Sequence, residues 1–272
     1  MAALVELPEV ATESKIQVRA LTREYDHGHQ RTLALDNIDL EVRRGEFLCL
    51  VGPSGCGKST LLHMIAGLDK PTSGQLLIDG STIDGPGPDR ILIFQELGLF
   101  PWLNVLENVE FGLKVRGVPR KERRERARHF IQLVHLSQFE HSYVHQLSGG
   151  MKQRVSLARA LCLDPGVLLM DEPFTALDAQ TRDLLHDELE RIWAETGQTI
   201  IFVTHNVREA VRLGDRVVVM SYRPGRIKRE FAIELGRSRS LEDPEVTLQA
   251  KEILAELRSE IDKAVHAEYK NA

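Results

Sequence analysis

One stretch near residue 50 constrains the fold more than any other part of the sequence. FLCLV at 47–51 is a continuous apolar run of strand length, GPSGCGKST at 52–60 is rich in glycine, and LLHMIAGL at 61–68 has helical spacing of its apolar residues. In this order, glycines let successive backbone amides face an anion at the start of the helix. The stretch therefore predicts a phosphate-binding loop. A tight structural turn is the alternative, and the flanking strand and helix disfavour it.

The residue types in this loop suit a nucleotide bound with magnesium. Lys58 supplies a positive charge for phosphate oxygens, and the Ser59 hydroxyl is an oxygen ligand of the kind that Mg²⁺ shares with substrate phosphates. The positions that we expect to contact the nucleotide here are Gly52, Pro53, Ser54, Gly55, Cys56, Gly57, Lys58, Ser59 and Thr60.

Two carboxylates end an apolar strand farther along the chain. VLLMDE at 167–172 places Asp171 and Glu172 at the carboxyl end of a strand, where open parallel sheets bind ligands. Asp171 suits the Mg²⁺ shell, and Glu172 suits a base that polarises the water attacking the terminal phosphate. The pair could simply end a strand, but a phosphate loop requires a partner carboxylate.

A second glycine-containing segment also precedes a helical pattern. LSGGMKQ at 147–153 places Ser148, Gly149 and Gly150 before apolar residues with helical spacing. An amide-rich helix start attracts anions, so one chain has two such starts. If both bind phosphate, then either the fold brings them together or two chains do.

These three motifs, in this order, resemble the ATPase subunits of ABC transporters over residues 16–227. GPSGCGKST resembles the Walker A motif, LSGGMKQ the ABC signature and VLLMDE the Walker B motif. The resemblance implies an α/β fold: a P-loop NTPase core with a mainly parallel sheet, an N-terminal antiparallel β layer and an inserted α-helical subdomain. It also implies ATP and Mg²⁺ as cofactors, and a head-to-tail dimer in which the signature residues act on the nucleotide of the other subunit.

The resemblance assigns four further positions. They are Tyr25 as the aromatic that stacks on adenine, Gln95 as the Q-loop glutamine, Asp178 as the D-loop aspartate and His205 as the switch histidine. Gln95 can reach both Mg²⁺ and water, and His205 can donate a hydrogen bond to the terminal phosphate. The implied catalytic residues are Glu172, His205 and Gln95, and the implied metal ligands are Ser59, Gln95 and Asp171. His27 and His29 could replace Tyr25 as stacking surfaces.

Composition restricts the partners. Lys and Arg total 35 against 40 Asp and Glu, a net charge of -5, so there is no overall basic field to attract nucleic acid. The apolar runs have strand length and fall short of the roughly 20 residues of a membrane-spanning helix. Glu6, Glu9 and Glu13 occupy an N-terminus without a basic region, which does not indicate a secretory signal. The cysteines at 49, 56 and 162 lack metal-like spacing and suit free thiols.

Other segments point to a membrane partner. Phe100, Pro101 and Trp102 follow the Q-loop directly, where transporter ATPases receive a helix of the membrane subunit, although ordinary packing is an alternative. DGPGPDR, LFPWLNV and SYRPGRI resemble segments of nitrate, sulfonate, taurine and bicarbonate importer ATPases. We therefore expect a peripheral protein at the cytoplasmic face of the inner membrane. It would pair with a second ATPase subunit, identical or homologous, and with permease subunits, and would act indirectly with a substrate-binding protein.

The expected domains are an N-terminal extension at 1–15, an ATPase domain at 16–235 with a helical subdomain at about 97–160, and a C-terminal helical tail at 236–272. In the tail, Ile253, Leu257, Ile261 and Val265 recur every four residues and predict an amphipathic helix. Two other functions fit the sequence less well. A nucleotide kinase would not need the signature segment, and a non-transport ABC machine acting on nucleic acid or on assemblies fits the acidic charge poorly.

Overall fold

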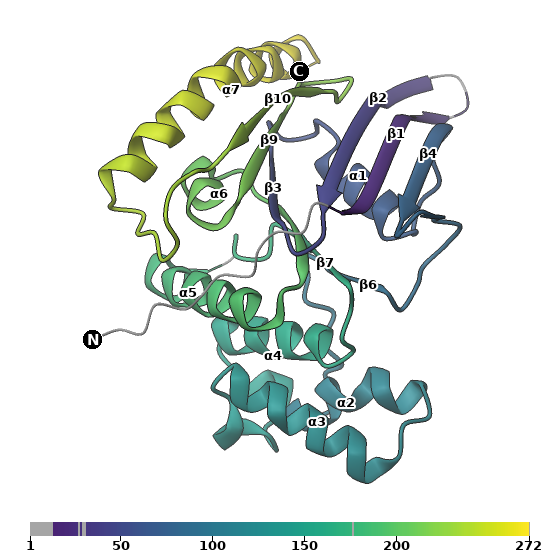
Figure 1. Cartoon of the computed structure of the whole chain (residues 1–272), viewed down its shortest axis with the longest axis vertical. Helices are drawn as coiled ribbons and strands as arrows, with labels where there is room; N and C mark the ends of the chain where they lie inside the picture. The colour runs from purple at the N-terminus through teal and green to yellow at the C-terminus, as the bar shows by residue number, and fades with distance from the viewer. Residues whose placement is uncertain (1–12, 27, 29–30, 176, 272) are drawn as a thin grey trace. The chain divides into compact units, whose positions relative to one another are not determined.

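The computed structural model describes residues 13–26, 28, 31–175 and 177–271 (Figure 1). The chain divides into two units. The first unit comprises Met1–Gly87 and Gln198–Ala272, and the second comprises Pro88–Gly197.

An antiparallel sheet opens the first unit, in the strand order β2-β1-β4-β5. Its strands are β1 (Ser14–Asp26), β2 (Arg31–Arg43), β4 (Ser73–Ile78) and β5 (Ser81–Thr82). Buried and exposed side chains alternate along the second half of β2, where Ile38, Leu40 and Val42 are buried. This alternation buries one face of the sheet, as the sequence pattern predicts.

Buried strands form the core of the first unit. They are β3 (Phe47–Val51), β8 (Thr199–Val203), β9 (Arg216–Met220) and β10 (Ile227–Ala232). β3 pairs in parallel with β8 and with β9, and β10 pairs antiparallel with β9. Every residue of β3 and β8 is buried, which explains why their sequences are continuously apolar. The helices of this unit are α1 (Lys58–Ile65), α6 (Val207–Leu213) and α7 (Pro244–Asn271).

The second unit is mainly helical. It contains the parallel strand pair β6 (Arg90–Ile93) and β7 (Val167–Asp171), the helices α2 (Val105–Val115), α3 (Arg120–Leu133), α4 (Gly149–Leu161) and α5 (Ala179–Thr196), and the short 3₁₀ helices η1 (Ser137–Phe139) and η2 (Val144–Gln146). The charged run that begins at Arg120 forms most of α3, where only Ala127 and Ile131 are buried. The run is therefore a solvated helix face.

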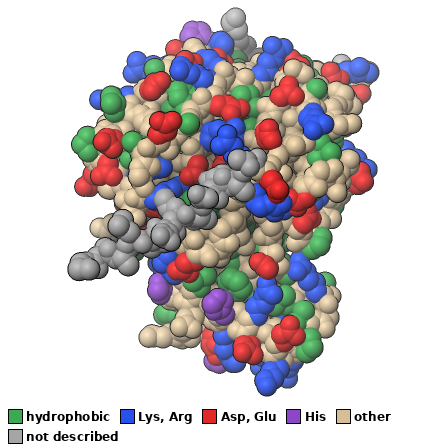
Figure 2. All heavy atoms as spheres, viewed as in Figure 1, with side chains coloured by type: hydrophobic (Ala, Val, Ile, Leu, Met, Phe, Trp, Pro, Cys, Tyr) green, Lys and Arg blue, Asp and Glu red, His purple; other side chains and the backbone are tan. Residues whose placement is uncertain are grey.

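The predicted α/β class is confirmed, with an antiparallel β layer, parallel strands and a set of helices between β6 and β7. The predicted domain limits at 16–235, about 97–160 and 236–272 stay predictions. No helix in the described part of the chain combines the length and apolar character needed to cross a membrane. On the face drawn in Figure 2, Lys and Arg are interspersed with Asp and Glu.

The four-residue spacing predicted for the C-terminal helix is only half right. Ile253 and Leu257 are buried, but Ile261 and Val265 are 38% and 42% exposed. A helix has 3.6 residues per turn, so a step of four drifts around the axis at each repeat. The buried stripe of α7 therefore continues through Glu260 and Ala264 instead.

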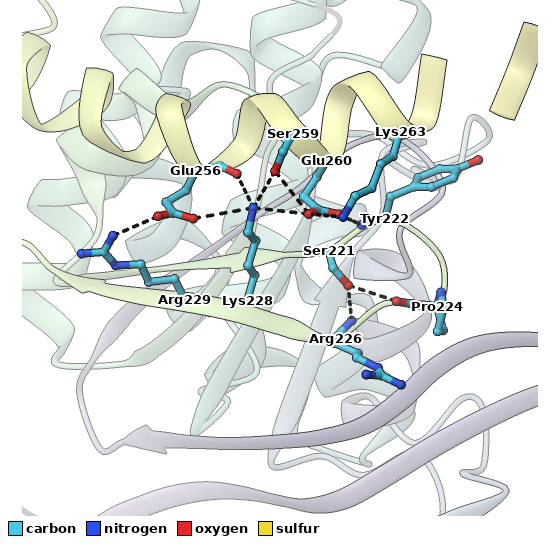
Figure 3. Close-up of polar contacts among 10 residues, drawn as sticks. All are labelled: Ser221, Tyr222, Pro224, Arg226, Lys228, Arg229, Glu256, Ser259, Glu260 and Lys263. Atoms are coloured by element: carbon cyan, nitrogen blue, oxygen red, sulfur yellow. Dashed lines mark hydrogen bonds and ion pairs between the residues drawn. The ribbon is translucent and has the colours of Figure 1, made fainter. Parts of the chain in front are cut away.

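Glu260 is a carboxylate inside an otherwise apolar stripe, and several donors surround it, among them the Ser259 hydroxyl at 3.4 Å (Figure 3). Its oxygens lie 2.8 Å from Lys263 Nζ and 3.3 Å from Lys228 Nζ, and one accepts a hydrogen bond of 2.9 Å from the Tyr222 amide. Burial alone would raise the pKa of Glu260, but the hydrogen bonds from Lys263, Tyr222 and Lys228 outweigh it and lower the pKa to about 2. The carboxylate is thus charged in the folded protein.

This cluster gives a pH-dependent contribution to stability. A carboxyl group whose pKa is lower in the folded than in the unfolded state stabilises the fold above its unfolded pKa of about 4.3, and that contribution is lost as the pH falls toward the folded value. We expect Glu260→Gln to lower the free energy of unfolding at pH 7 by about 2 kcal/mol. The difference in unfolding free energy between the variant and the wild type should shrink between pH 5 and pH 3, because protonation of Glu260 removes the same stabilising charge from the wild type.

Denaturant unfolding at several pH values measures this. Glu252→Gln, an exposed carboxylate on the same helix, is the control and should differ little from wild type throughout. If the loss of unfolding free energy in Glu260→Gln does not depend on pH, then the stabilisation does not come from the charged carboxylate of Glu260.

Candidate functional site

The predicted phosphate loop joins β3 directly to α1. Gly57 is the N-cap residue of α1 and has φ 102, a left-handed conformation that favours glycine. A Cβ at Gly57 would also lie 2.5 Å from Leu35 Cδ2, so glycine is required for space as well. The first turn of α1 contains no acidic side chain. Its exposed amides therefore form a favourable site for an anion.

Lys58 is held inside the loop by backbone carbonyls. Its side chain is buried, and Nζ donates to Gly52 O at 2.9 Å and to Pro53 O at 3.1 Å. Cys56 is buried beside it, and this burial raises the pKa of the Cys56 thiol. Cys56 therefore packs as a neutral side chain, and Lys58 is the charged group of the loop.

Tyr25 lies near the end of β1 and its orientation is fixed. Its hydroxyl donates to Asp69 Oδ2 at 2.8 Å, and the Arg23 guanidinium lies 4.4 Å from the ring centroid. Arg23 also pairs with Asp69 at 2.8 Å. Arg23 and Asp69 together hold the ring in this orientation. The alternatives His27 and His29 lie outside the described residues.

His205 occupies the turn between β8 and α6. It is exposed, and residues on either side of it are tightly bonded: the Thr204 hydroxyl donates to the Glu209 carboxylate, and Asn206 Oδ1 accepts from the amides of Arg208 and Glu209 as the N-cap of α6. These bonds fix the backbone of the turn. His205 is thereby presented on a rigid strand-to-helix connection.

In the second unit, Asp171 and Glu172 follow the buried residues of β7, as predicted. Both are partly exposed, and Glu172 Oε2 accepts a hydrogen bond of 3.3 Å from Thr175 Oγ1. Glu172 has φ 44, in the left-handed region that a non-glycine residue rarely adopts. Such strain persists where the surroundings impose it, and it is concentrated at functional sites.

Ser148, Gly149 and Gly150 form the start of α4. Ser148 is the N-cap residue, and its hydroxyl accepts from the Met151 amide at 3.3 Å. Gly149 is exposed, whereas Gly150 is buried, and a Cβ there would lie 2.5 Å from Thr181 Cγ2. The first turn has no acidic residue. The segment therefore has the features of an anion-binding helix start, with its second glycine fitted against α5.

Thr181 connects this segment to Asp178. Asp178 is the N-cap of α5, and it accepts hydrogen bonds from the Thr181 amide at 2.9 Å and the Thr181 hydroxyl at 2.7 Å. These two bonds hold the pKa of Asp178 below its ordinary value, so it stays ionised. The contact between Thr181 and Gly150 was not predicted, because no local pattern marks a residue that packs on a distant glycine.

Gln95 is exposed just after β6, and the segment that follows it is fixed by two residues that the sequence analysis missed. Arg159 donates to Leu97 O at 2.8 Å and to Gly98 O at 2.7 Å. Asn108 is fully buried and donates to Phe100 O, Leu103 O and Asn104 O at 3.0 to 3.1 Å.

An apolar pocket of about 330 Å³ lies beside this segment, with Phe100, Phe111 and Arg159 in its lining. The ring centroid of Phe100 lies 4.5 Å from that of Phe111 and 5.6 Å from that of Trp102. Phe100 is therefore an anchored part of the second unit, whereas Trp102 is 70% exposed. An exposed tryptophan on a fixed turn is suited to bind another protein.

The chain matches the family model of ABC transporters over residues 35–175. It is 52% identical to an ABC transporter ATP-binding protein of Methanocaldococcus jannaschii that is described as uncharacterised, over 92% of this chain and 94% of that protein. It is 50% identical to the nitrate import ATP-binding protein NrtD of a Synechocystis species, over 81% of this chain and 83% of that protein. The taurine import ATP-binding protein TauB of Roseobacter denitrificans is 45% identical, over 81% of this chain and 85% of that protein.

Solved structures show the same fold. The ATP-binding cassette MJ0796, in a dimeric post-hydrolysis state bound to ADP and phosphate, matches with a TM-score of 0.71 at 35% identity, over 81% of this chain and 100% of that chain. The cbiO1 protein of Clostridium perfringens, part of the cbiONQ ABC transporter complex, matches with a TM-score of 0.75 at 28% identity, over 94% and 100%.

The contact between Gly150 and Thr181 can be tested by compensation. We expect Gly150→Ala to lower the free energy of unfolding by about 1–3 kcal/mol, because the added methyl group overpacks against the Thr181 methyl group. Thr181→Ser removes that methyl group and keeps the hydroxyl for Asp178, so the double variant should recover most of the loss. Denaturant unfolding measures both effects.

Gly149→Ala is the matched control, because a Cβ at Gly149 would meet only Leu177 Cδ2 at 3.7 Å. Equal losses for the two glycine variants, or no recovery in the double variant, would contradict this packing.

Proposed function

The chain belongs to the ABC transporter family, and we propose on that basis that it is the ATP-binding and ATP-hydrolysing subunit of an importer for a small oxyanion. The observation that carries the proposal is the presence of two separately built anion-binding helix starts, α1 and α4, each preceded by glycine or a capping serine and neither containing an acid in its first turn. A site that binds one nucleotide needs only one of them. The second is explained if it contacts a nucleotide held by another copy.

In this proposal the loop at 52–60 binds the ATP phosphates through its amides, and Tyr25 stacks on adenine. Lys58 exchanges its bonds to the Gly52 and Pro53 carbonyls for phosphate oxygens. Ser59, Gln95 and Asp171 carry hydroxyl, amide and carboxylate oxygens, which are ligands of the type that Mg²⁺ prefers. Bound Mg²⁺ would supply charge neutralisation between the β- and γ-phosphates.

Glu172 is proposed to orient and polarise the attacking water. Its left-handed backbone ends the strand at this residue, and a strained conformation of this kind is concentrated at functional sites. His205 donates a hydrogen bond to the γ-phosphate or to the water, and its rigid turn suits this task because phosphoryl transfer depends on positioning.

Two subunits, identical or homologous, are proposed to close face to face. Ser148, Gly149 and Gly150 of one subunit would then complete the phosphate site of the other. The solved relative MJ0796 is dimeric. Asp178 supports this arrangement, because Thr181 links it to Gly150. ATP binding would favour the closed pair, and hydrolysis would let it reopen.

The permease partner is proposed to dock at the segment around Phe100 and Trp102. Relatives named for nitrate and taurine import support an importer whose substrate is a small oxyanion such as nitrate, sulfonate, taurine or bicarbonate. The subunit would lie peripherally at the cytoplasmic face of the inner membrane, and would act indirectly with a substrate-binding protein. The mixed charges on the face drawn in Figure 2 are one reason for proposing no nucleic-acid partner.

Removing the proposed base tests whether two subunits together form the ATP site, which we call the composite site. We expect Glu172→Gln to lower ATP turnover by at least about a hundredfold and to leave ATP binding intact, so that Mg-ATP converts the variant into a stable dimer. Turnover assays and size-exclusion light scattering measure this. Glu122→Gln, an exposed carboxylate on α3, should behave as wild type, and Lys58→Ala should lose ATP binding itself. A Glu172→Gln protein that stays monomeric with wild-type turnover would refute the composite site.

Replacing the exposed tryptophan tests the docking surface. We expect Trp102→Ala to weaken association with the permease by more than about tenfold, because an exposed aromatic anchor contributes strongly to an interface. The turnover of the isolated subunit should not change. Phe139→Ala, another exposed aromatic of the second unit, is the control in a pull-down with detergent-solubilised permease. Equal binding of the permease by both variants would show that Trp102 is not part of the interface. Recovery of soluble partners without any permease would favour a non-transport function.

A further inference from the structure

The hairpin loop between β9 and β10 has a closed and well-bonded shape (Figure 3). It has the sequence SYRPGR at 221–226. The Ser221 hydroxyl donates to Pro224 O and accepts from the Arg226 amide, both at 3.0 Å, and the Ser221 amide donates to Arg226 O at 2.9 Å. The loop can therefore transmit a displacement at one end to the other.

The backbone of this loop packs directly on the phosphate loop. Gly225 exchanges two hydrogen bonds with β2, donating to Ala34 O at 2.9 Å and accepting from the Asp36 amide at 3.0 Å. A Cβ at Gly225 would lie 2.1 Å from Cys56 O, so only glycine permits this approach. The two loops are in van der Waals contact at Cys56.

Arg223 forms a second link, through a hydrogen bond. Its Nε donates to Gly55 O at 3.0 Å, and its guanidinium lies so close that a Cβ at Gly55 would be 2.8 Å from Nη2. In a trans peptide the carbonyl of one residue and the amide of the next point in opposite directions. Holding the Gly55 carbonyl therefore also fixes the direction of the Cys56 amide, which donates to Pro53 O at 3.3 Å and closes the turn of the loop. The curvature of such a loop is what directs its other amides toward a phosphate.

The other end of the hairpin loop is attached to α7. The amide of Tyr222, the residue before Arg223, donates to Glu260 Oε2 at 2.9 Å. The Glu260 side chain is 3% exposed and is held in turn by Lys228 and Lys263. A continuous chain of contacts thus runs from α7 through Glu260, Tyr222 and Arg223 to the phosphate loop.

We propose that Arg223 is a positioning residue for ATP binding, and that Glu260 of the C-terminal helix sets its position. Arg223 holds the phosphate loop in the conformation that receives the nucleotide, and Glu260 holds the hairpin loop that carries Arg223. The inference rests on ATP being the ligand of the phosphate loop. It gives a role to SYRPGR and to the C-terminal helix, two segments that the ATP site described above does not use.

Equilibrium titration of the full chain with ATP, followed by steady-state hydrolysis, tests Arg223. We expect Arg223→Ala to raise both the dissociation constant and KM for ATP by about three- to tenfold, with kcat at saturation within about twofold of wild type. The melting temperature of the ATP-free protein should not change, because Arg223 is exposed. Arg223→Lys keeps a positive donor and should recover part of the affinity.

Arg226→Ala is the matched control. Arg226 lies on the same loop and is also exposed, but it pairs with Asp36 and not with the phosphate loop. Its ATP affinity should equal that of wild type. The proposal is overturned if Arg223→Ala binds ATP as wild type does, or if Arg226→Ala loses as much. Titration of the wild type in the same series tests whether the chain binds ATP. A wild type that does not bind ATP would contradict the proposed function, and this outcome is distinct from an unchanged affinity of Arg223→Ala.

A double-mutant cycle tests the link to α7. We expect Glu260→Ala to weaken ATP binding about threefold, and Arg223→Ala to add little further loss in the same chain, because both act through one contact. Additive losses would overturn the link. If Glu260→Ala does not fold, Glu260→Leu takes its place in the cycle, since it continues the apolar stripe of α7 and still removes the oxygen that accepts from the Tyr222 amide.

Discussion

The carbonyls of the loop at 52–60 need donors on the side away from the proposed nucleotide site, and two side chains of the first unit supply them. A loop whose amides all face an anion must direct its carbonyls elsewhere, and a polar group without a partner is unfavourable when buried. Lys58 donates to the Gly52 and Pro53 carbonyls, and Arg223 donates to that of Gly55. Two cations from different parts of the chain thus stabilise one curved backbone.

The second unit builds its anion-binding helix start with side chains. Ser148 caps α4 and Asp178 caps α5, and Thr181 contacts both the cap of α5 and Gly150, the second glycine of α4. This arrangement leaves Gly149 exposed while fixing the helix that carries it. The two helix starts therefore reach the same chemistry by different routes, which agrees with their different proposed roles.

Local features were predictable, and contacts between distant segments were not. The strand, glycine loop and helix at 47–68 and the carboxylates at 171 and 172 follow from patterns within a few residues. Leu35 against Gly57 and Thr181 against Gly150 depend on how elements pack, which no local pattern records. The spacing of four in α7 was wrong about Ile261 and Val265 because it exceeds the helical period.

Glu260 is a charged residue at a position of α7 where an apolar side chain would continue the buried stripe. A leucine at this position would continue the apolar stripe of α7 and would avoid burying a charge, and such replacements are often neutral or stabilising. It could not, however, accept a hydrogen bond from the Tyr222 amide. An apolar contact would hold the helix to the strands without fixing the hairpin loop in one position. A directional carboxylate at this point is therefore best explained by what the hairpin loop holds, which is the carbonyl of Gly55 in the phosphate loop.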